Sequence, residues 1–156
     1  MDKVVMINKE IQIIHYYNED VYKSSILKYN DIKIGDSDST FETEMYEIKN
    51  IFIHERFQGL GYGQMFLQYI ITEIQDNYIK LKVCNTFKDA IHIYEKSGFK
   101  YVRYECHAAT IFNIMIRSPA NIIPNIMLKY PPQSTIEWID EHYEKFAEKG
   151  YVYDSD

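Results

Sequence analysis

The strongest constraint on the fold is a glycine-rich turn between an extended segment and a helical one. Residues 44–54 (EMYEIKNIFIH) are rich in β-branched and aromatic side chains, which are typical of a strand. Residues 62–76 then place apolar side chains at helical spacing: Met65, Phe66, Tyr69, Ile70 and Ile74. Between them, residues 58–63 (QGLGYG) carry three glycines. This order predicts an anion site, because the first N–H groups of a helix lack partners and glycines let an anion approach them.

The turn fits neither of two familiar phosphate-binding motifs. A P-loop requires Lys and then Ser or Thr after its last glycine, whereas Gly63 is followed by Gln64 and Met65. The dinucleotide fingerprint G-x-G-x-x-G does not match the spacing of Gly59, Gly61 and Gly63. The turn does fit a third pattern, Q/R-x-x-G-x-G/A, in which Gln58 takes the first position.

The rest of the chain predicts a mixed α/β domain. After the glycine turn and its helix, strands are expected at 78–84, 99–106 and 110–117. The helix between the first two of these would be capped by Asn85 or Thr86 and would end at Gly98. Ahead of the turn, short strands are expected at 4–7, 10–16 and 31–34, followed by a loop at 35–39 (GDSDS). Residues 21–29 fit a strand or a short helix, and their β-branched and aromatic content favours the strand.

The C-terminal segment differs from the rest because it holds all four prolines, at 119, 124, 131 and 132. Ser134 and Glu137 then predict a capping box for a helix at about 135–149, closed by Gly150. Its apolar stripe would consist of Ile136, Ile139, Tyr143 and Phe146. We expect this helix to dock on the domain as an added element, so that residues 1–156 form a single domain.

Length and composition narrow the class of protein. A chain of 156 residues with 46% hydrophobic and 26% charged residues predicts one globular domain with its own core. No apolar run approaches the roughly 20 residues of a membrane span, and no secretory signal is visible. Two cysteines, Cys84 and Cys106, favour a reduced, cytoplasmic protein without a Cys-based zinc site, and no metal is expected. A net charge of −6 argues against a nucleic-acid partner.

Two blocks of the sequence resemble the GNAT superfamily of acetyl-CoA-dependent N-acetyltransferases. The first is the pattern formed by Gln58, Gly61 and Gly63, which in that family holds the pyrophosphate of coenzyme A through backbone amides. The second is residues 85–99 (NTFKDAIHIYEKSGF), which match an Asn after the fifth strand, an Ala, and then Tyr-Glu-Lys-x-Gly-Phe. A weaker third match, residues 112–116 (FNIMI), resembles the family's last strand. The resemblance covers about residues 41–117.

The resemblance implies a GNAT-like α/β fold with a mixed, mostly antiparallel sheet flanked by helices. The sheet would split between the strands at 44–54 and 78–84, where acetyl-CoA inserts. Residues 41–117 would form the acetyl-CoA-binding core and residues 118–156 a C-terminal extension. The N-terminal part is shortened, because residues 1–40 leave little room for the two helices usual there. The implied cofactor-binding residues are Ile51, Phe52, Ile53, Gln58, Gly59, Leu60, Gly61, Tyr62, Gly63, Gln64, Asn85 and Tyr94.

The implied reaction is direct transfer of acetyl from acetyl-CoA to a primary amine. Tyr94 matches the tyrosine that protonates the leaving thiolate, although a core tyrosine is the alternative in a chain with 15 of them. Glu47 is the candidate general base, with His54 as a second candidate and a solvated acidic strand edge as the structural alternative. Backbone amides of residues 51–53 would stabilise the oxyanion.

The acidic residues Glu42, Glu44 and Glu47 favour a cationic acceptor, either a small amine such as a polyamine or aminoglycoside-like compound, or a protein Lys or N-terminus. Two other functions remain open from the sequence: a non-catalytic acyl-CoA-binding module used in sensing or assembly, and transfer of a longer acyl group. The C-terminal helix is also compatible with a role in forming a homodimer.

Overall fold

The computed structural model describes residues 2–74, 76–124 and 127–149, with side chains of the last helix described to residue 141. The strands are β1 Asp2–Met6, β2 Ile11–Asn18, β3 Val21–Tyr29, β4 Ile32–Glu42, β5 Met45–Ile53, β6 Tyr78–Cys84, β7 Lys100–His107 and β8 Thr110–Arg117. The helices are α1 Tyr62–Glu73, α2 Lys88–Lys96 and α3 Gln133–Lys149, with a short 3₁₀ helix η1 at Glu55–Phe57. None of the helices in these ranges is long and apolar enough to cross a membrane.

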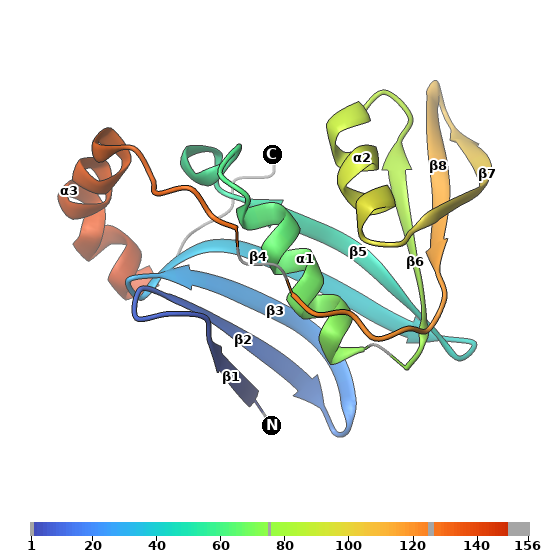
Figure 1. The fold of residues 1–156 in the computed structure, drawn as a ribbon, viewed down its shortest axis with the longest axis horizontal. Helices are drawn as coiled ribbons and strands as arrows, with labels where there is room; N and C mark the ends of the chain where they lie inside the picture. Colours follow the sequence, from blue (N-terminus) through green and yellow to red (C-terminus); the bar gives the residue numbers. More distant parts are fainter. Residues whose placement is uncertain (1, 75, 125–126, 150–156) are drawn as a thin grey trace.

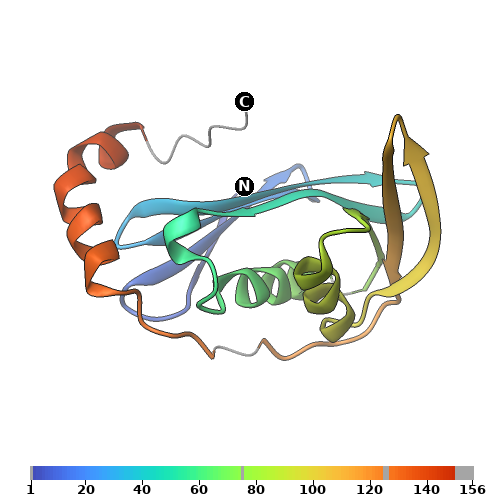
Figure 2. The same cartoon turned by 90° about the horizontal axis from the view of Figure 1, so that it is seen from above.

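The strands form one sheet in the order β1-β2-β3-β4-β5-β6-β8-β7, in which only the β5–β6 pair is parallel. Helices α1 and α2 lie on the same side of the sheet, and α3 lies at one end of it (Figures 1 and 2). The mixed, mostly antiparallel sheet flanked by helices confirms the fold class expected from the sequence.

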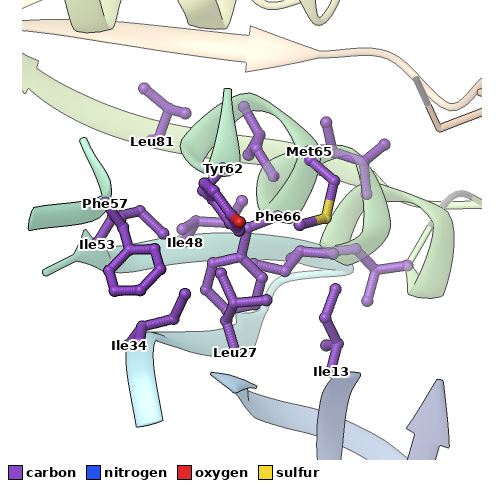
Figure 3. Packing of buried hydrophobic residues seen from close by; sticks show 14 of the residues in the cluster. Ile13, Leu27, Ile34, Ile48, Ile53, Phe57, Tyr62, Met65, Phe66 and Leu81 are labelled. Carbon is purple, nitrogen blue, oxygen red and sulfur yellow. The ribbon is translucent and has the colours of Figure 1, made fainter. Parts of the chain in front are cut away.

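The hydrophobic core lies between the sheet and α1. Leu67, Ile70 and Ile71 of α1 are fully buried, and Phe66 belongs to the same buried cluster as Leu27 and Ile48 of the sheet (Figure 3). Burying a side chain of this size contributes roughly 1.5–3 kcal/mol. The helical spacing predicted for residues 62–76 is therefore confirmed as the buried face of α1, which ends at Glu73.

A bulge in β5 decides which of its side chains face the helices. Asp38 of β4 pairs with Asn50, but the next residue, Ser39, pairs with Ile48, so Lys49 is an extra residue in β5. Before the bulge Ile48 points to the core, and after it Ile51 and Ile53 take the inward positions. Without the extra residue, alternation would turn Ile51 and Ile53 to the opposite face.

The sheet splits beside this bulge. The parallel ladder between β5 and β6 runs only from Met45 and Tyr78 to Ile48 and Leu81. Beyond these residues β5 continues along β4, whereas β6 continues along β8, and the two strands separate (Figure 1). The expected split between the strands at 44–54 and 78–84 is thus confirmed.

The loop predicted at residues 35–39 is wrong, because these residues are the centre of β4. Their polar side chains alternate: Ser37 and Ser39 are buried, while Asp36 and Asp38 face outward. Ser37 donates to the main-chain oxygen of Asn50 at 2.6 Å. Strand pairing on both sides, to β3 and β5, overrides the low strand propensity of the sequence GDSDS.

Two predicted helix caps are also wrong. Helix α2 begins at Lys88, so Phe87 takes the N-cap position and no side chain caps the helix. The Thr86 hydroxyl contacts Cys84 Sγ at 3.2 Å instead. Helix α3 begins at Gln133, so Ser134 lies inside the first turn and cannot form the predicted capping box with Glu137. The predicted closing residue Gly150 and the side chains of Tyr143 and Phe146 lie outside the described residues.

The N-terminal half confirms the expected shortening. Strand β2 turns directly into β3 through Glu19 and Asp20, with φ of 58° at Glu19, and the described residues before α1 contain no α-helix. At the other end, α3 docks on the domain as predicted, since Ile139 is 4% exposed and belongs to the core cluster.

Candidate functional site

The glycine turn is held in place by aromatic packing beneath it. Phe57, the last residue of η1, is fully buried, and its ring meets the ring of Tyr62 edge-on at 5.4 Å between centroids. Tyr62 is the first residue of α1, so this contact fixes the start of the helix relative to the end of β5. Gly61 precedes it in a left-handed conformation (φ 96°), which glycine adopts without steric strain.

The start of α1 presents unpartnered N–H groups. The N-cap residue is Gly61, so no side chain caps the helix. The first helical hydrogen bond runs from the N–H of Met65 to the main-chain oxygen of Gly61. The N–H groups of Tyr62, Gly63 and Gln64 therefore have no protein acceptor among the described residues. With the positive end of the helix dipole behind them, they offer the kind of donors that an anion site needs, so the anion site expected from the sequence stays a prediction.

Gln58 takes a structural role at the base of the turn. Its side-chain Nε2 donates to the main-chain oxygen of Ile53 at 2.8 Å, and its own N–H donates to Glu55 at 3.2 Å. Both groups are thus engaged inside the protein. Of the residues 58–64 expected to bind the cofactor, Gln58 shapes the loop, while the N–H groups at the helix start remain available.

A small apolar cavity of about 90 Å³ opens where the sheet splits. It is lined by Ile51 and Ile53 of β5, Gly63 and Leu67 of α1, and Ala90, Ile93 and Tyr94 of α2. The structure therefore brings together four residues expected to act in one site: Ile51, Ile53, Gly63 and Tyr94. Three elements distant in the sequence meet here, and Gly63, at the start of α1, is part of the cavity lining.

Tyr94 is held over this cavity by the well-closed end of α2. Gly98, with φ of 93°, donates to Glu95, and Phe99 donates to Tyr94, which is the Schellman arrangement. The ring of Phe99 packs edge-on against the Tyr94 ring at 6.0 Å. Burial raises the pKa of the Tyr94 phenol above its usual range, so the hydroxyl stays protonated at neutral pH.

Asn85 lies just after β6, outside the group that lines the cavity. Its main-chain N–H donates to Ile111 at 3.0 Å, which ties the end of β6 to the β7–β8 hairpin. Asn85 is half-buried, and its side chain makes no hydrogen bond within the described part of the chain. It remains a candidate for binding a ligand that extends along the split.

Glu47 faces the side of the sheet opposite the cavity. Its neighbours Tyr46 and Ile48 point into the core, so alternation directs Glu47 outward. There it lines a separate hollow of about 210 Å³ with Thr40, Glu42 and Lys80, and its carboxylate lies 3.1 Å from Lys49 Nζ. Glu47 and Tyr94 thus flank the β5–β6 split from opposite faces of the sheet.

The open face of the sheet carries acidic residues of β4, in the segment for which the sequence predicts a loop. Asp36 and Asp38 of β4 and Asn50 of β5 line a shallow hollow of about 570 Å³. Asn50 donates to Asp36 at 3.3 Å, and Lys33 pairs with Asp36 at the same distance. The alternation of Asp and Ser in residues 36–39 is the sequence signal that points to a strand here, since it has the period of a strand with one buried face.

His54, the second candidate base, has a structural role instead. Its Nδ1 accepts a hydrogen bond from the N–H of Arg56 at 3.1 Å and so caps η1. Its ring packs on the ring of Trp138 in α3 at 5.0 Å. Burial lowers the pKa of His54, and the ring is not among the residues that line the cavity.

The comparison with protein families identifies the chain. The model of the acetyltransferase (GNAT) domain matches residues 14–101, which is more than half of the sequence. The protein therefore belongs to the GNAT acetyltransferase family. The match begins well before residue 41 and so includes most of β2, β3 and β4 in the family's fold. A comparison with curated proteins gives no match.

Solved structures of this family share the fold. The ribosomal-protein-S18-alanine N-acetyltransferase of Escherichia coli matches with a TM-score of 0.60 and 15% identity, over 81% of this chain and 99% of that one. A GNAT family acetyltransferase from Elizabethkingia anophelis with acetyl-CoA bound gives 0.57 and 17%, over 71% and 99%. The putative acetyltransferase yncA of Salmonella typhimurium, with its cofactor acetyl-CoA, gives 0.54 and 14%, over 66% and 68%.

Proposed function

We propose that this protein transfers an acetyl group from acetyl-CoA to a primary amine. The observation that carries the proposal is the cavity in the split sheet. It joins Tyr94, the inward side chains of β5 and the start of α1 in one place. Membership of the GNAT acetyltransferase family and the acetyl-CoA bound to relatives of the same fold support it.

The pyrophosphate of coenzyme A would bind at the start of α1. The N–H groups of Tyr62, Gly63 and Gln64 supply donors and the positive end of a helix dipole. Gly63 leaves open space, since a Cβ added there meets no atom closer than 3.8 Å. Backbone donors need no basic side chain, which makes a cofactor with several negative charges compatible with a net charge of −6.

The pantetheine arm and the thioester would lie in the split between β5 and β6. Ile51 and Ile53 lie beyond the last β5–β6 pair, and their side chains line the apolar cavity with Leu67 and Ile93. Main-chain N–H groups in residues 51–53 would stabilise the oxyanion that forms when the amine attacks the thioester carbon. Such donors are fixed by the sheet before the reaction begins.

The amine would reach the thioester from the open face of the sheet. A free alkylamine has a pKa near about 10, so it must lose a proton before it attacks. Glu47 is the base we propose for this step, directly or through water, because it lies on that face beside the split. Asp36 and Asp38 on the same face would attract the cation as it arrives.

Tyr94 would supply the proton that the leaving thiolate takes up. Its raised pKa keeps the phenol protonated, and it lines the cavity in which the thioester would lie. Collapse of the tetrahedral intermediate breaks the carbon–sulfur bond. The phenol proton then goes to sulfur, and the acetyl group remains on nitrogen as an amide.

The test is release of free thiol from acetyl-CoA in the presence of a panel of amines. We expect the wild-type protein to release thiol with cationic primary amines, and Tyr94→Phe to lower kcat by about 10- to 100-fold while acetyl-CoA still binds. Glu47→Gln should lower the rate most at the pH where the amine is largely protonated.

Binding of acetyl-CoA without turnover on any amine would refute the transferase and favour the alternative of a non-catalytic acyl-CoA-binding module. Turnover confined to neutral or anionic amines would refute the proposed acceptor class. The panel should include a polyamine, an aminoglycoside, a lysine-containing peptide and a peptide with a free N-terminus, because acidic residues on the open face would attract any of these cations. A parallel assay with longer acyl-CoA thioesters tests the remaining alternative.

A further inference from the structure

The C-terminal extension contacts the glycine turn directly. We call residues 127–131, which lead into α3, the strap. The N–H of Lys129 in the strap donates to the main-chain oxygen of Leu60 at 2.9 Å. Leu128 and Leu60 are both partly buried, and both pack against the core cluster. A segment far along the chain is thus joined, main chain to main chain, to the turn that precedes α1.

The strap also explains why residue 61 must be glycine. A Cβ at this position would lie 2.7 Å from the main-chain oxygen of Met127 and 3.4 Å from the Leu128 side chain. Gly59, by contrast, has a similar left-handed φ of 76° but no atom within 4 Å of its added Cβ. Both glycines suit the turn conformation, and only Gly61 is covered by the strap.

Helix α3 holds the same loop at a second place, next to η1. The Arg56 guanidinium lies 4.6 Å from the centre of the Trp138 ring, and Thr135 donates to the main-chain oxygen of Arg56 at 3.4 Å. Residues 128–131 of the strap also line a cavity of about 180 Å³ together with Glu10, Tyr29 and Tyr62. The main-chain hydrogen bond of Lys129 and the close approach of Met127 thus both fall on the turn, at Leu60 and Gly61.

We propose that the strap and α3 form a clamp that positions the glycine turn for coenzyme A, with Lys129 and Leu128 as positioning residues. This inference rests on the proposed function. A turn with two left-handed glycines has many accessible conformations when it is unsupported, and ordering it opposes binding. Contacts at Leu60, Gly61 and Arg56 hold it in one conformation beforehand, which strengthens cofactor binding without touching the reacting atoms.

The experiment compares Lys129→Pro with Lys129→Ala in the full chain. Proline removes the N–H that bonds Leu60, whereas alanine keeps it and removes only the side chain. We expect Lys129→Pro to raise the Kd for coenzyme A by about fivefold, the loss of one hydrogen bond, and Lys129→Ala to change it by less than about twofold. The kcat at saturating acetyl-CoA should change by less than about twofold in both, because no strap residue lines the cavity that contains Tyr94.

A second pair of variants keeps the test valid if Lys129→Pro fails to fold. Leu128→Ala removes a side chain that packs on the turn, while Ile123→Ala, in the chain ahead of the strap, removes one that is 90% exposed. We expect weaker binding of coenzyme A from the first only. Binding is also reciprocal, so saturating coenzyme A should slow hydrogen exchange at the Lys129 amide of the wild-type protein.

The outcomes separate this inference from the proposed function. If the wild-type protein binds coenzyme A but Lys129→Pro and Leu128→Ala bind it equally well, the clamp is refuted and the transferase stands. Equal weakening by Lys129→Ala and Lys129→Pro would also refute the clamp, since a side-chain contact would then explain the loss. If the wild-type protein does not bind coenzyme A, the proposed function fails and the clamp fails with it.

Discussion

Lowering the pH should destabilise the protein through one buried histidine. His15 of β2 is fully buried, and its Nδ1 lies 2.6 Å from the Ser25 hydroxyl, which in turn lies 2.5 Å from the Tyr22 hydroxyl. Its Nε2 has no hydrogen-bond partner within the described residues and lies 3.9 Å from a carboxylate oxygen of Glu73. Burial lowers the pKa of His15 from 6.5 to about 4, which outweighs the attraction of Glu73.

The sign follows from which state binds the proton more readily. The unfolded chain takes up a proton on His15 as pH falls below 6.5, while the folded protein resists until about pH 4. The contribution of the neutral His15 to the free energy of unfolding is therefore present above pH 6.5 and is lost as pH falls toward 4. The difference between the two pKa values corresponds to about 3 kcal/mol of unfolding free energy in total, of which about 2 kcal/mol is lost between pH 7.5 and 5.

Urea unfolding at several pH values measures this loss. The variant His15→Gln removes the titrating ring, and its free energy of unfolding should fall by about 2 kcal/mol less than that of the wild type between pH 7.5 and 5. Ser25→Ala is the matched control, because it removes the hydroxyl beside His15 but keeps the ring, so its pH slope should match the wild type. If His15→Gln loses stability as steeply as the wild type, the argument from burial is wrong.

Three further predictions concern strand packing, the core and the acceptor face. Gly35→Ala should lower the free energy of unfolding by about 1–3 kcal/mol in urea, because the added Cβ lies 2.7 Å from the main-chain oxygen of Phe52. Gly63→Ala, with no atom closer than 3.8 Å, should change it by less than about 1 kcal/mol, and equal losses would contradict the steric argument. Phe66→Ala should cost about 3–5 kcal/mol in the same measurement, since the ring is fully buried, and a loss below about 1 kcal/mol would contradict its place in the core. Asp38→Asn should raise the KM for a cationic amine by about fivefold at low salt and leave the KM for acetyl-CoA unchanged; a KM for the amine that is the same in both proteins would exclude Asp38 from the acceptor face.

The second half of the fold was predictable because its signals are local. Residues 62–76 repeat apolar side chains with the period of a helix, and Gly98 closes α2 with the conformation that glycine tolerates best. The turn at 58–63 places three glycines directly before a helix, and this order predicts a helix N-terminus that an anion can approach closely. These features depend on neighbours within a few residues, so the sequence contains them directly.

The errors arose where distant partners decide the structure. Residues 35–39 have the composition of a loop, yet β3 and β5 supply hydrogen bonds on both sides and make them a strand. Helix α3 begins at Gln133, ahead of the start predicted from the capping-box spacing of Ser134 and Glu137. In each case the local preference is worth about 1 kcal/mol, which pairing and burial readily exceed.

The sequence by itself predicted the family, an anion site at the start of α1 and the candidates Tyr94 and Glu47, because each rests on a short motif or a local period. Only the tertiary structure decided that Glu47 and Tyr94 lie on opposite faces of the split sheet. The extra residue at Lys49 turns Ile51 and Ile53, which line the cavity with Tyr94, to the face opposite Glu47. The position of the strap on Gly61 was likewise beyond the sequence, because it depends on main-chain contacts between segments more than 60 residues apart.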